Sequence, residues 1–167
     1  MTREFRPWRY RFHRWMYRSG RPNRLARFMN NASALQFGHG ILAPRHWVTL
    51  EVPGRHTGRT ISSPLVEVDV EGERYLVAML GPATNWVRNV QAADGRAVLR
   101  HGDREAVRLD EVAVGARAPI LRRYLDRAPG ARPHFPVRRG APVGDFARVA
   151  DRYPVFRVTP DPAQVTS

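Results

Sequence analysis

The stretch WVTLEVPGRHTGRTISSPLVEVDV, residues 47–70, decides the fold. An apolar run, Trp47–Val52, enters the turn Gly54–Arg59, and an alternating run, Ile61–Val70, leaves it. Two β-patterned segments joined by a short glycine-bracketed turn predict a β-hairpin. We expect both glycines of the turn to adopt positive φ angles.

The turn is rich in hydrogen-bond donors. Beside Gly58 stand Arg55, His56, Thr57 and Arg59. Backbone N–H groups next to guanidinium forks form a natural pocket for an anion. The other interpretation is a solvated hairpin tip with surface arginines, which is the commoner case for a lone basic turn.

Length and composition exclude several classes of protein. A chain of 167 residues with 43% hydrophobic residues fits one globular domain. It has no run of about 20 apolar residues that could span a membrane, and we see no secretory signal. The absence of cysteine excludes disulfides, thiolate catalysis and cysteine-ligated metals. We expect a cytoplasmic protein.

The net charge of +13 arises from arginine alone, because the sequence contains no lysine. Arginine stays charged and presents a planar fork that suits phosphate and carboxylate. Without lysine, Schiff-base chemistry is excluded. A positive field of this size favours a polyanionic cofactor, nucleic acid or an acidic membrane surface, and charge alone does not choose among them.

The N-terminal segment alternates arginines with aromatic residues. Trp8, Phe12 and Trp15 have the spacing of one helix face. This basic helix could lie on an anionic membrane surface or pack its aromatics on the domain, and both interpretations stay open. Leu25–Ala32 suggests a second short helix. His39 stands without a partner at metal-ligand spacing, so we expect no metal site.

The rest of the chain continues in hairpin order. Further strands are predicted at 75–80, 96–100, 104–114 and 153–159, and helices at 86–93, 115–128 and 145–152. We expect Thr84 or Asn85 to cap the first of these helices and Asp94-Gly95 to end it. Without a βαβ rhythm or a Gly-x-Gly-x-x-Gly motif, an antiparallel barrel is favoured over a Rossmann fold.

Four ordered segments carry a resemblance to a known family: Val52–Arg59, Ser62–Leu65, Tyr75–Ala78 and Asn85–Asn89. Together they resemble the deazaflavin-dependent nitroreductase family, in one order and register from about residue 40 to 114. Its members are split β-barrel oxidoreductases that bind coenzyme F-420 (8-hydroxy-5-deazaflavin). The resemblance implies a mainly β fold, a six-stranded antiparallel split β-barrel of the FMN-binding type with N-terminal helices.

The resemblance also implies a domain plan and a site. Residues 1–40 would form an N-terminal helical extension, residues 41–160 the coenzyme-binding barrel and residues 161–167 a loose tail. The implied coenzyme-binding residues are Arg55, His56, Thr57, Gly58, Arg59, Ser62, Ser63, Pro64, Ala78, Met79, Leu80, Gly81, Asn85, Trp86, Arg88 and Asn89. Hydride chemistry would belong to the coenzyme, so no catalytic residue is assigned.

Two departures from the family pattern keep alternatives open. His56 stands where the family commonly has lysine, and Ile61 where it often has arginine, although Arg59 or Arg88 could compensate. The first hypothesis is a reductase that passes hydride from coenzyme F-420 to a quinone, nitro or other conjugated acceptor. The second is a split barrel that binds FMN, haem or lipid, and the third is a non-enzymatic basic module for nucleic acid or membrane.

The expected partners follow from the first hypothesis. We expect a small-molecule electron acceptor and no nucleic acid, with peripheral membrane contact through the N-terminal helix left open. The chain could be a monomer or a homodimer. Tyr124, Tyr153 and His134 could border the acceptor pocket, and ordinary packing is the alternative role for each.

Overall fold

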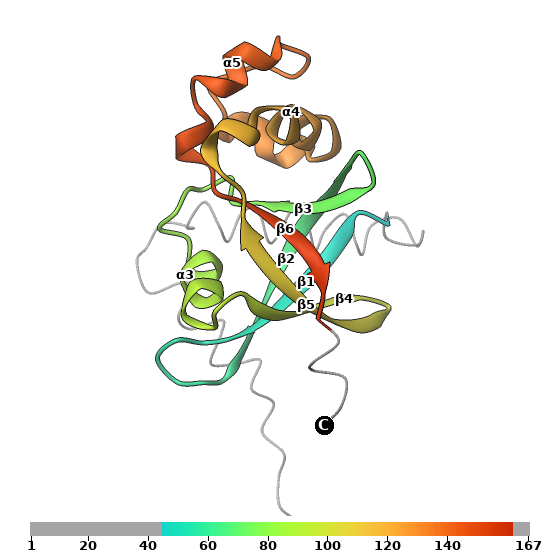
Figure 1. Ribbon diagram of the computed structural model, residues 1–167, viewed down its shortest axis with the longest axis vertical. Coiled ribbons are helices and arrows are strands. Elements are labelled where there is room, and N and C mark those ends of the chain that lie inside the picture. Colours follow the sequence, from blue (N-terminus) through green and yellow to red (C-terminus); the bar gives the residue numbers. More distant parts are fainter. Residues whose placement is uncertain (1–44, 162–167) are drawn as a thin grey trace, which may run out of the picture. The chain divides into compact units, whose positions relative to one another are not determined.

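The computed structural model describes residues 45–161 (Figure 1). The predicted N-terminal helices, His39 and the C-terminal tail lie outside the described residues. No helix within the described range has the length and hydropathy of a membrane span.

Six antiparallel strands form a closed barrel, which confirms the predicted fold. The strands are β1 (Trp47–Pro53), β2 (Thr60–Val70), β3 (Glu73–Val77), β4 (Arg96–His101), β5 (Asp103–Glu111) and β6 (Val155–Pro160). Their order around the barrel is β1-β2-β3-β6-β5-β4. Closure removes the unpaired edges that an open sheet of these strands would expose.

Short helices flank the barrel: α3 (Asn85–Ala92), α4 (Ala118–Arg127), α5 (Val143–Ala147) and 3₁₀ turns at Val114–Ala116, Pro129–His134 and Ala150–Arg152. In Figure 1, α3 lies beside the β1–β2 loop at one end, and α4 and α5 lie together at the other. The helix predicted from residue 115 begins at Ala118 instead. A 3₁₀ turn precedes it, and a proline occupies its first turn, where the missing N–H costs nothing.

Apolar side chains from the strands fill the barrel, with only the partly buried Leu65 from β2, and α3 closes one end. Leu50, Leu76, Val107 and Phe156 contribute from the strands. From α3, Trp86 packs edge-on against Phe156, with ring centroids 5.4 Å apart. Burying one such side chain contributes about 1.5–3 kcal/mol, so these contacts fix α3 on the barrel.

The valines of β2 lie outside the barrel. Val66 and Val68 are buried but do not belong to the central cluster, and β2 packs against α4. Leu65 on the other face does pack on the cluster. Because strand side chains alternate between faces, Glu67 points to the interior with Leu65. The cross-strand partner of Glu67 is Leu76, itself a core residue, which agrees with this orientation.

The inward-pointing Glu67 belongs to a charged group on the inner face of the sheet. Arg74 donates two hydrogen bonds to Glu105, at 2.9 and 2.7 Å. The guanidinium lies 3.7 Å from Glu67. Burial raises the pKa of Glu67 above its ordinary value, although Arg74 opposes the shift. One arginine therefore contacts two carboxylates at a partly buried position.

The turn after α3 confirms the predicted helix stop. Asp94 and Gly95 have φ angles of 55° and 79°. The N–H of Gly95 returns to the carbonyl of Val90 at 2.9 Å, and the N–H of Leu109 bonds to the carbonyl of Gly95 at 2.8 Å. A Cβ atom on Gly95 would lie 2.6 Å from the Leu109 carbonyl oxygen, so only glycine fits here.

Candidate functional site

The β1–β2 loop, residues 54–59, is closed by its own hydrogen bonds. The Gly54 N–H donates to the carbonyl of Arg59 at 2.8 Å, and the Gly58 N–H donates to the carbonyl of Gly54 at 2.8 Å. The Arg59 N–H donates to Oγ1 of Thr57 at 3.3 Å. The loop therefore has one defined conformation at the end of a fixed strand register.

The two glycines of the loop serve different purposes. Gly58 has a φ of 68°, as predicted. The prediction is wrong for Gly54, which is not among the positive-φ residues. Gly54 is needed for space: a Cβ atom would lie 2.8 Å from Cδ1 of Ile61 and 3.2 Å from the carbonyl oxygen of Arg59. The loop can close over Ile61 only because residue 54 is a glycine and carries no Cβ atom.

Helix α3 presents two asparagines to the loop. Asn85 and Asn89 are four residues apart and share one helix face. Thr84 occupies the predicted cap position, but its hydroxyl donates to the carbonyl of Gly81 at 2.7 Å and makes no cap bond. The hydroxyl thus ties the start of α3 to the turn before it.

Arg55 joins the loop to this face of α3. Its guanidinium donates to Oδ1 of Asn89 at 2.9 Å, and its backbone N–H donates to the same oxygen at 3.3 Å. A second guanidinium nitrogen lies 3.5 Å from Oδ1 of Asn85. Both acceptors are neutral amides, so they fix the arginine without neutralising it.

The side-chain nitrogen of Asn89, Nδ2, is not used as a hydrogen-bond donor within residues 45–161. Its side chain is 1% exposed, and Nδ2 has no hydrogen-bond partner among the described residues. Turning the amide over would not help, because Oδ1 already accepts two N–H groups of Arg55. A buried unpaired donor costs about 1–3 kcal/mol. Asn89 therefore carries an unsatisfied donor next to the oxygen that holds Arg55.

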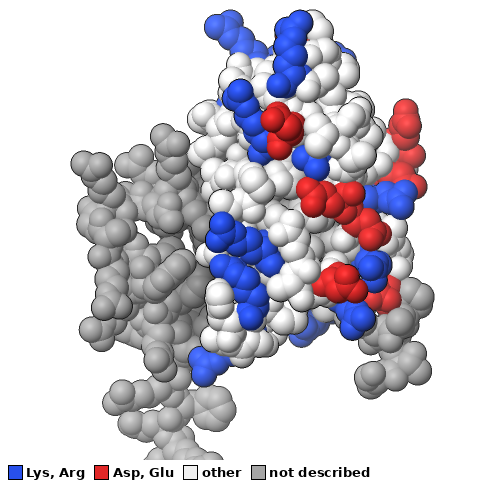
Figure 2. Space-filling model, turned by 60° about the vertical axis from the view of Figure 1, so that its left-hand side comes forward, with Lys and Arg blue, Asp and Glu red and all other residues white. Residues whose placement is uncertain are grey.

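Further donors surround Arg55. The backbone N–H groups of His56 and Thr57 have no acceptor among the described residues. Arg59 and Arg88 are exposed, and no ion pair within residues 45–161 neutralises them. Figure 2 shows a group of arginine side chains with no acidic side chain among them, while acidic and basic groups mix elsewhere on that face.

The predicted serine pair is divided by the strand. Ser62 and Ser63 lie in β2, paired with Glu51 and Leu50 of β1. Neighbouring strand residues point to opposite faces, so the two hydroxyls cannot face the same ligand surface. Ser63 shares its face with the core side chain of Leu50. Pro64, the next predicted residue, is half-buried and pairs with Thr49.

At the predicted strand end, residues 78–81, two of the four backbone N–H groups are hydrogen-bonded within the described range and the other two are not. The Ala78 N–H donates to Pro154 at 2.9 Å, and the Gly81 N–H donates to Ala78 at 3.0 Å. The N–H groups of Met79 and Leu80 have no acceptor among the described residues. Of these four residues, Met79 and Leu80 are therefore the two whose backbone donors are unused within the described part of the chain.

Some predicted side chains lie in packed surroundings. Trp86 is 5% exposed and belongs to the barrel core. Tyr153 donates its hydroxyl to the carbonyl of His134 at 2.8 Å and stacks on Phe135 with centroids 3.9 Å apart. Burial raises the pKa of Tyr124 far above its usual range. Trp86 thus supports α3 from beneath, and the tyrosines are packed side chains in this structure.

The sequence did not reveal the part that Ile61 takes in the site. It was singled out only as a departure, yet its side chain supports the loop under Gly54. The predicted hairpin could have indicated this role, because its register pairs Ile61 with Val52 at the base of the loop. Within residues 45–161 no group of three potential metal-ligating side chains occurs.

A family model described as F420H(2)-dependent quinone reductase matches residues 23–140. No curated protein matched the chain. Among solved structures, Atu2129 of Agrobacterium tumefaciens, of unknown function, is 15% identical with a TM-score of 0.51. The match covers 77% of this chain and 54% of that one, so the chain spans about half the length of this neighbour.

Two further structures are similar at lower scores. A structure named F420-H2 dependent reductase (FDR-A) is 22% identical, with a TM-score of 0.45 and coverage of 71% of this chain and 98% of that one. A pyridoxinephosphate oxidase family protein from Clostridium acetobutylicum is 13% identical, with a TM-score of 0.47 and coverage of 80% and 84%.

Proposed function

Because the chain belongs to the F420H(2)-dependent quinone reductase family, we propose that it transfers hydride from reduced coenzyme F-420 to a quinone, nitro compound or other conjugated acceptor. The family makes the chain an oxidoreductase that uses coenzyme F-420 and reduces a small molecule. The acceptor class and the residues that bind the coenzyme are the proposed part. In this proposal residues 41–160 are the coenzyme-binding domain.

The observation that carries the proposed site is the way Arg55 is held. An arginine paired with a carboxylate is neutralised, whereas Arg55 is fixed by the neutral amides of Asn85 and Asn89. It stays exposed and keeps its full charge. A positioned, charged guanidinium at the surface is suited to a phosphodiester or a carboxylate.

The residues around Arg55 fit the anionic end of the coenzyme. Arg59 and Arg88 supply unpaired charge, and the N–H groups of His56 and Thr57 supply neutral donors. Asn89 adds its buried Nδ2 donor. We assign these five residues and Arg55 to binding of the phosphodiester end. His56 contributes through its backbone N–H group, which has no acceptor among the described residues.

Bound coenzyme supplies the hydride, so the chain's residues orient and shield rather than react. The free N–H groups of Met79 and Leu80 would donate to the coenzyme ring. Trp86 would act from beneath, because its contact with Phe156 holds α3 and hence Asn85 and Asn89 in place. Orientation of two reactants by such fixed groups can account for much of a rate enhancement.

Equilibrium titration tests the proposal directly. We expect the full chain to bind coenzyme F-420 more tightly than FMN, and to oxidise the reduced coenzyme only when a quinone or nitro acceptor is added. Haem and FMN are run as comparison ligands. Tighter binding of FMN, or no oxidation with any acceptor, would reject the proposed reaction. Contact of the basic, aromatic N-terminal segment around Trp8–Trp15 with a membrane stays a prediction, because this segment lies outside the described range.

A further inference from the structure

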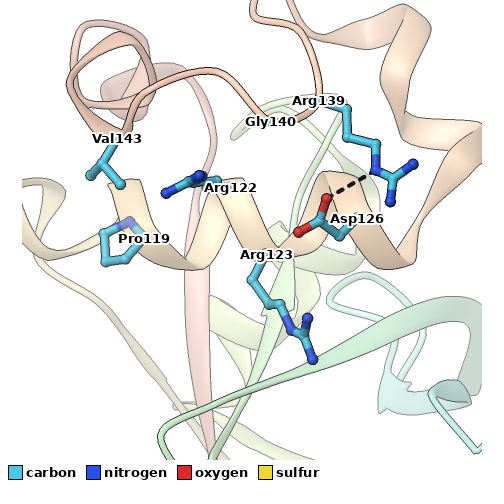
Figure 3. A pocket seen from close by; sticks show the side chains of 7 residues that line it. All are labelled: Pro119, Arg122, Arg123, Asp126, Arg139, Gly140 and Val143. Atoms are coloured by element: carbon cyan, nitrogen blue, oxygen red, sulfur yellow. Dashed lines mark hydrogen bonds and ion pairs between the residues drawn. The ribbon is translucent and has the colours of Figure 1, made fainter.

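A hollow of the surface lies on α4, and none of its lining residues belongs to the Arg55 loop. It has a volume of about 620 Å³ and is lined by Pro119, Arg122, Arg123, Asp126, Arg139, Gly140 and Val143 (Figure 3). Nothing in the proposed reductase function uses these residues. We call this hollow the α4 groove.

The floor of the α4 groove is one face of the helix. Pro119, Arg122, Arg123 and Asp126 are three or four residues apart and form a continuous patch. The opposite face of α4, with Leu121 and its buried neighbours, packs into the protein. The helix therefore has no apolar face left for a bilayer, in contrast to helices that lie in a membrane surface.

The wall of the groove is held in place by one ion pair. Nε of Arg139 donates to Oδ1 of Asp126 at 3.0 Å, which ties the loop after α4 to the helix. Gly140, with a φ of 78°, turns that loop. Because the contact uses Nε, both terminal nitrogens of Arg139 remain available as donors.

The groove carries an excess of positive charge. Three guanidinium groups and one carboxylate line it, which leaves a net charge of +2. Neither Arg122 nor Arg123 forms an ion pair with a described residue. In Figure 3, Arg122 lies on the side of the helix towards Val143, and Arg123 points away from the loop. Arg139 lies at the other end of the drawn helix segment beside Asp126, so Arg122 and Arg139 stand at the two ends of the hollow.

We propose that the α4 groove is a binding site for a soluble molecule with a phosphate monoester or diphosphate group, held by Arg122 and Arg139. A phosphate monoester carries about −1.5 to −2 charges at neutral pH, which matches the net charge of the groove. Arginine forks bind phosphate oxygens in pairs. The proposal does not depend on the reductase function, because the site shares no residue with the Arg55 loop.

Pyrophosphate is the probe, and binding to the full chain is measured by calorimetry and by the rise in melting temperature. Arg122→Ala should weaken binding by about tenfold, the scale of one charge-assisted hydrogen bond. Arg157→Ala should leave it unchanged, since this exposed residue lies outside the groove and outside the Arg55 loop. An equal loss in Arg157→Ala would mean non-specific attraction and would overturn the proposal.

Asp126→Asn gives a test of opposite sign. The amide oxygen can still accept from Arg139, while the negative charge inside the groove is gone. We expect pyrophosphate to bind several-fold more tightly to this variant. A purely structural Asp126–Arg139 pair predicts no such gain, so an unchanged or weaker affinity would count against the site. Binding to phosphatidylglycerol vesicles or to nucleic acid without pyrophosphate binding would also overturn it.

Discussion

Arg117 and Arg55 are each held by several hydrogen bonds, but Arg117 lies in the interior and Arg55 at the surface. The comparison of the two separates a structural role from a ligand-binding role. Arg117 is 5% exposed. Its guanidinium donates to the carbonyls of Val112, Ala150 and Tyr153 at 2.8, 3.3 and 3.3 Å. It also pairs with Glu111 at 3.0 Å. Its charge and its donors are used within the chain.

Arg55 contrasts in both respects. It is exposed, and its acceptors are the neutral amides of Asn85 and Asn89. The hydrogen bonds fix the position of its charge, but no carboxylate neutralises that charge within the described residues. Stability should therefore depend on Arg117 and ligand affinity on Arg55, and each variant below tests one side of that division.

The largest effect is expected for Arg117→Ala. The substitution leaves carbonyls just after β5 and before β6 without their donor, which should lower the free energy of unfolding by about 3 kcal/mol. Urea denaturation measures it. The exposed Arg157→Ala should change stability by less than about 0.5 kcal/mol. A stable Arg117→Ala protein would remove the structural side of the comparison.

The second effect is on binding. Arg55→Ala should weaken coenzyme F-420 binding by about 1.5–3 kcal/mol, the scale of a hydrogen bond to a charged group. The free energy of unfolding should change far less than in Arg117→Ala. Fluorescence titration gives the affinity. Arg55→Lys keeps the charge but cannot span Asn85 and Asn89, so it should recover only part of the loss. Unchanged affinity in Arg55→Ala would take the loop out of the site.

Much of this arrangement could be predicted from local patterns. Alternation and glycine-bracketed turns gave the six strands, because each hairpin is specified by neighbouring residues. The contact between Arg55 and α3 was not predicted, because the family resemblance only placed Arg55, Asn85 and Asn89 in one set of implied coenzyme-binding residues. Periodicity alone could place Asn85 and Asn89 on one helix face, but not that face against a loop 30 residues earlier.

Long-range roles could not be predicted. Arg117 is one of 28 arginines, and its acceptors at Ala150 and Tyr153 are 33 and 36 residues away. The alternation of β2 defines two faces but not which one is inside. Because α4 covers the outer face, the valines are buried there and Glu67 points inward.

The third effect concerns the loop that carries Arg55. Gly54→Ala places a Cβ atom 2.8 Å from Cδ1 of Ile61. Such overpacking should lower the free energy of unfolding by about 1 kcal/mol and weaken the coenzyme affinity by displacing Arg55. Adding Ile61→Val removes the clashing methyl group and should restore part of both. In Gly144→Ala, where nothing lies within 4 Å, we expect no loss. Failure of the rescue would mean that the contact with Arg59 dominates.

The smallest effect is expected for Glu67, one of the two carboxylates that contact Arg74. Arg74 is intermediate between Arg117 and Arg55, because it is half-buried and its charge is shared by two carboxylates. Burial raises the pKa of Glu67 in the folded protein. Its contribution to stability is therefore fully present below its ordinary pKa of 4.5 and is lost as the pH rises through the raised folded value. Glu67→Gln imitates the protonated form, so this variant should be more stable than the wild-type protein at pH 7, by less than about 1 kcal/mol.

That advantage should shrink as the pH falls towards 4.5, because Glu67 of the wild-type protein then takes up its proton. Urea denaturation at several pH values measures the difference between the two proteins. Glu73→Gln, at an exposed site on the same strand as Arg74, is the matched control and should show no such trend. A Glu67→Gln protein that is less stable at pH 7 would show that attraction to Arg74 outweighs burial. Arg74 would then belong with Arg117 as an arginine whose charge is used up inside the fold.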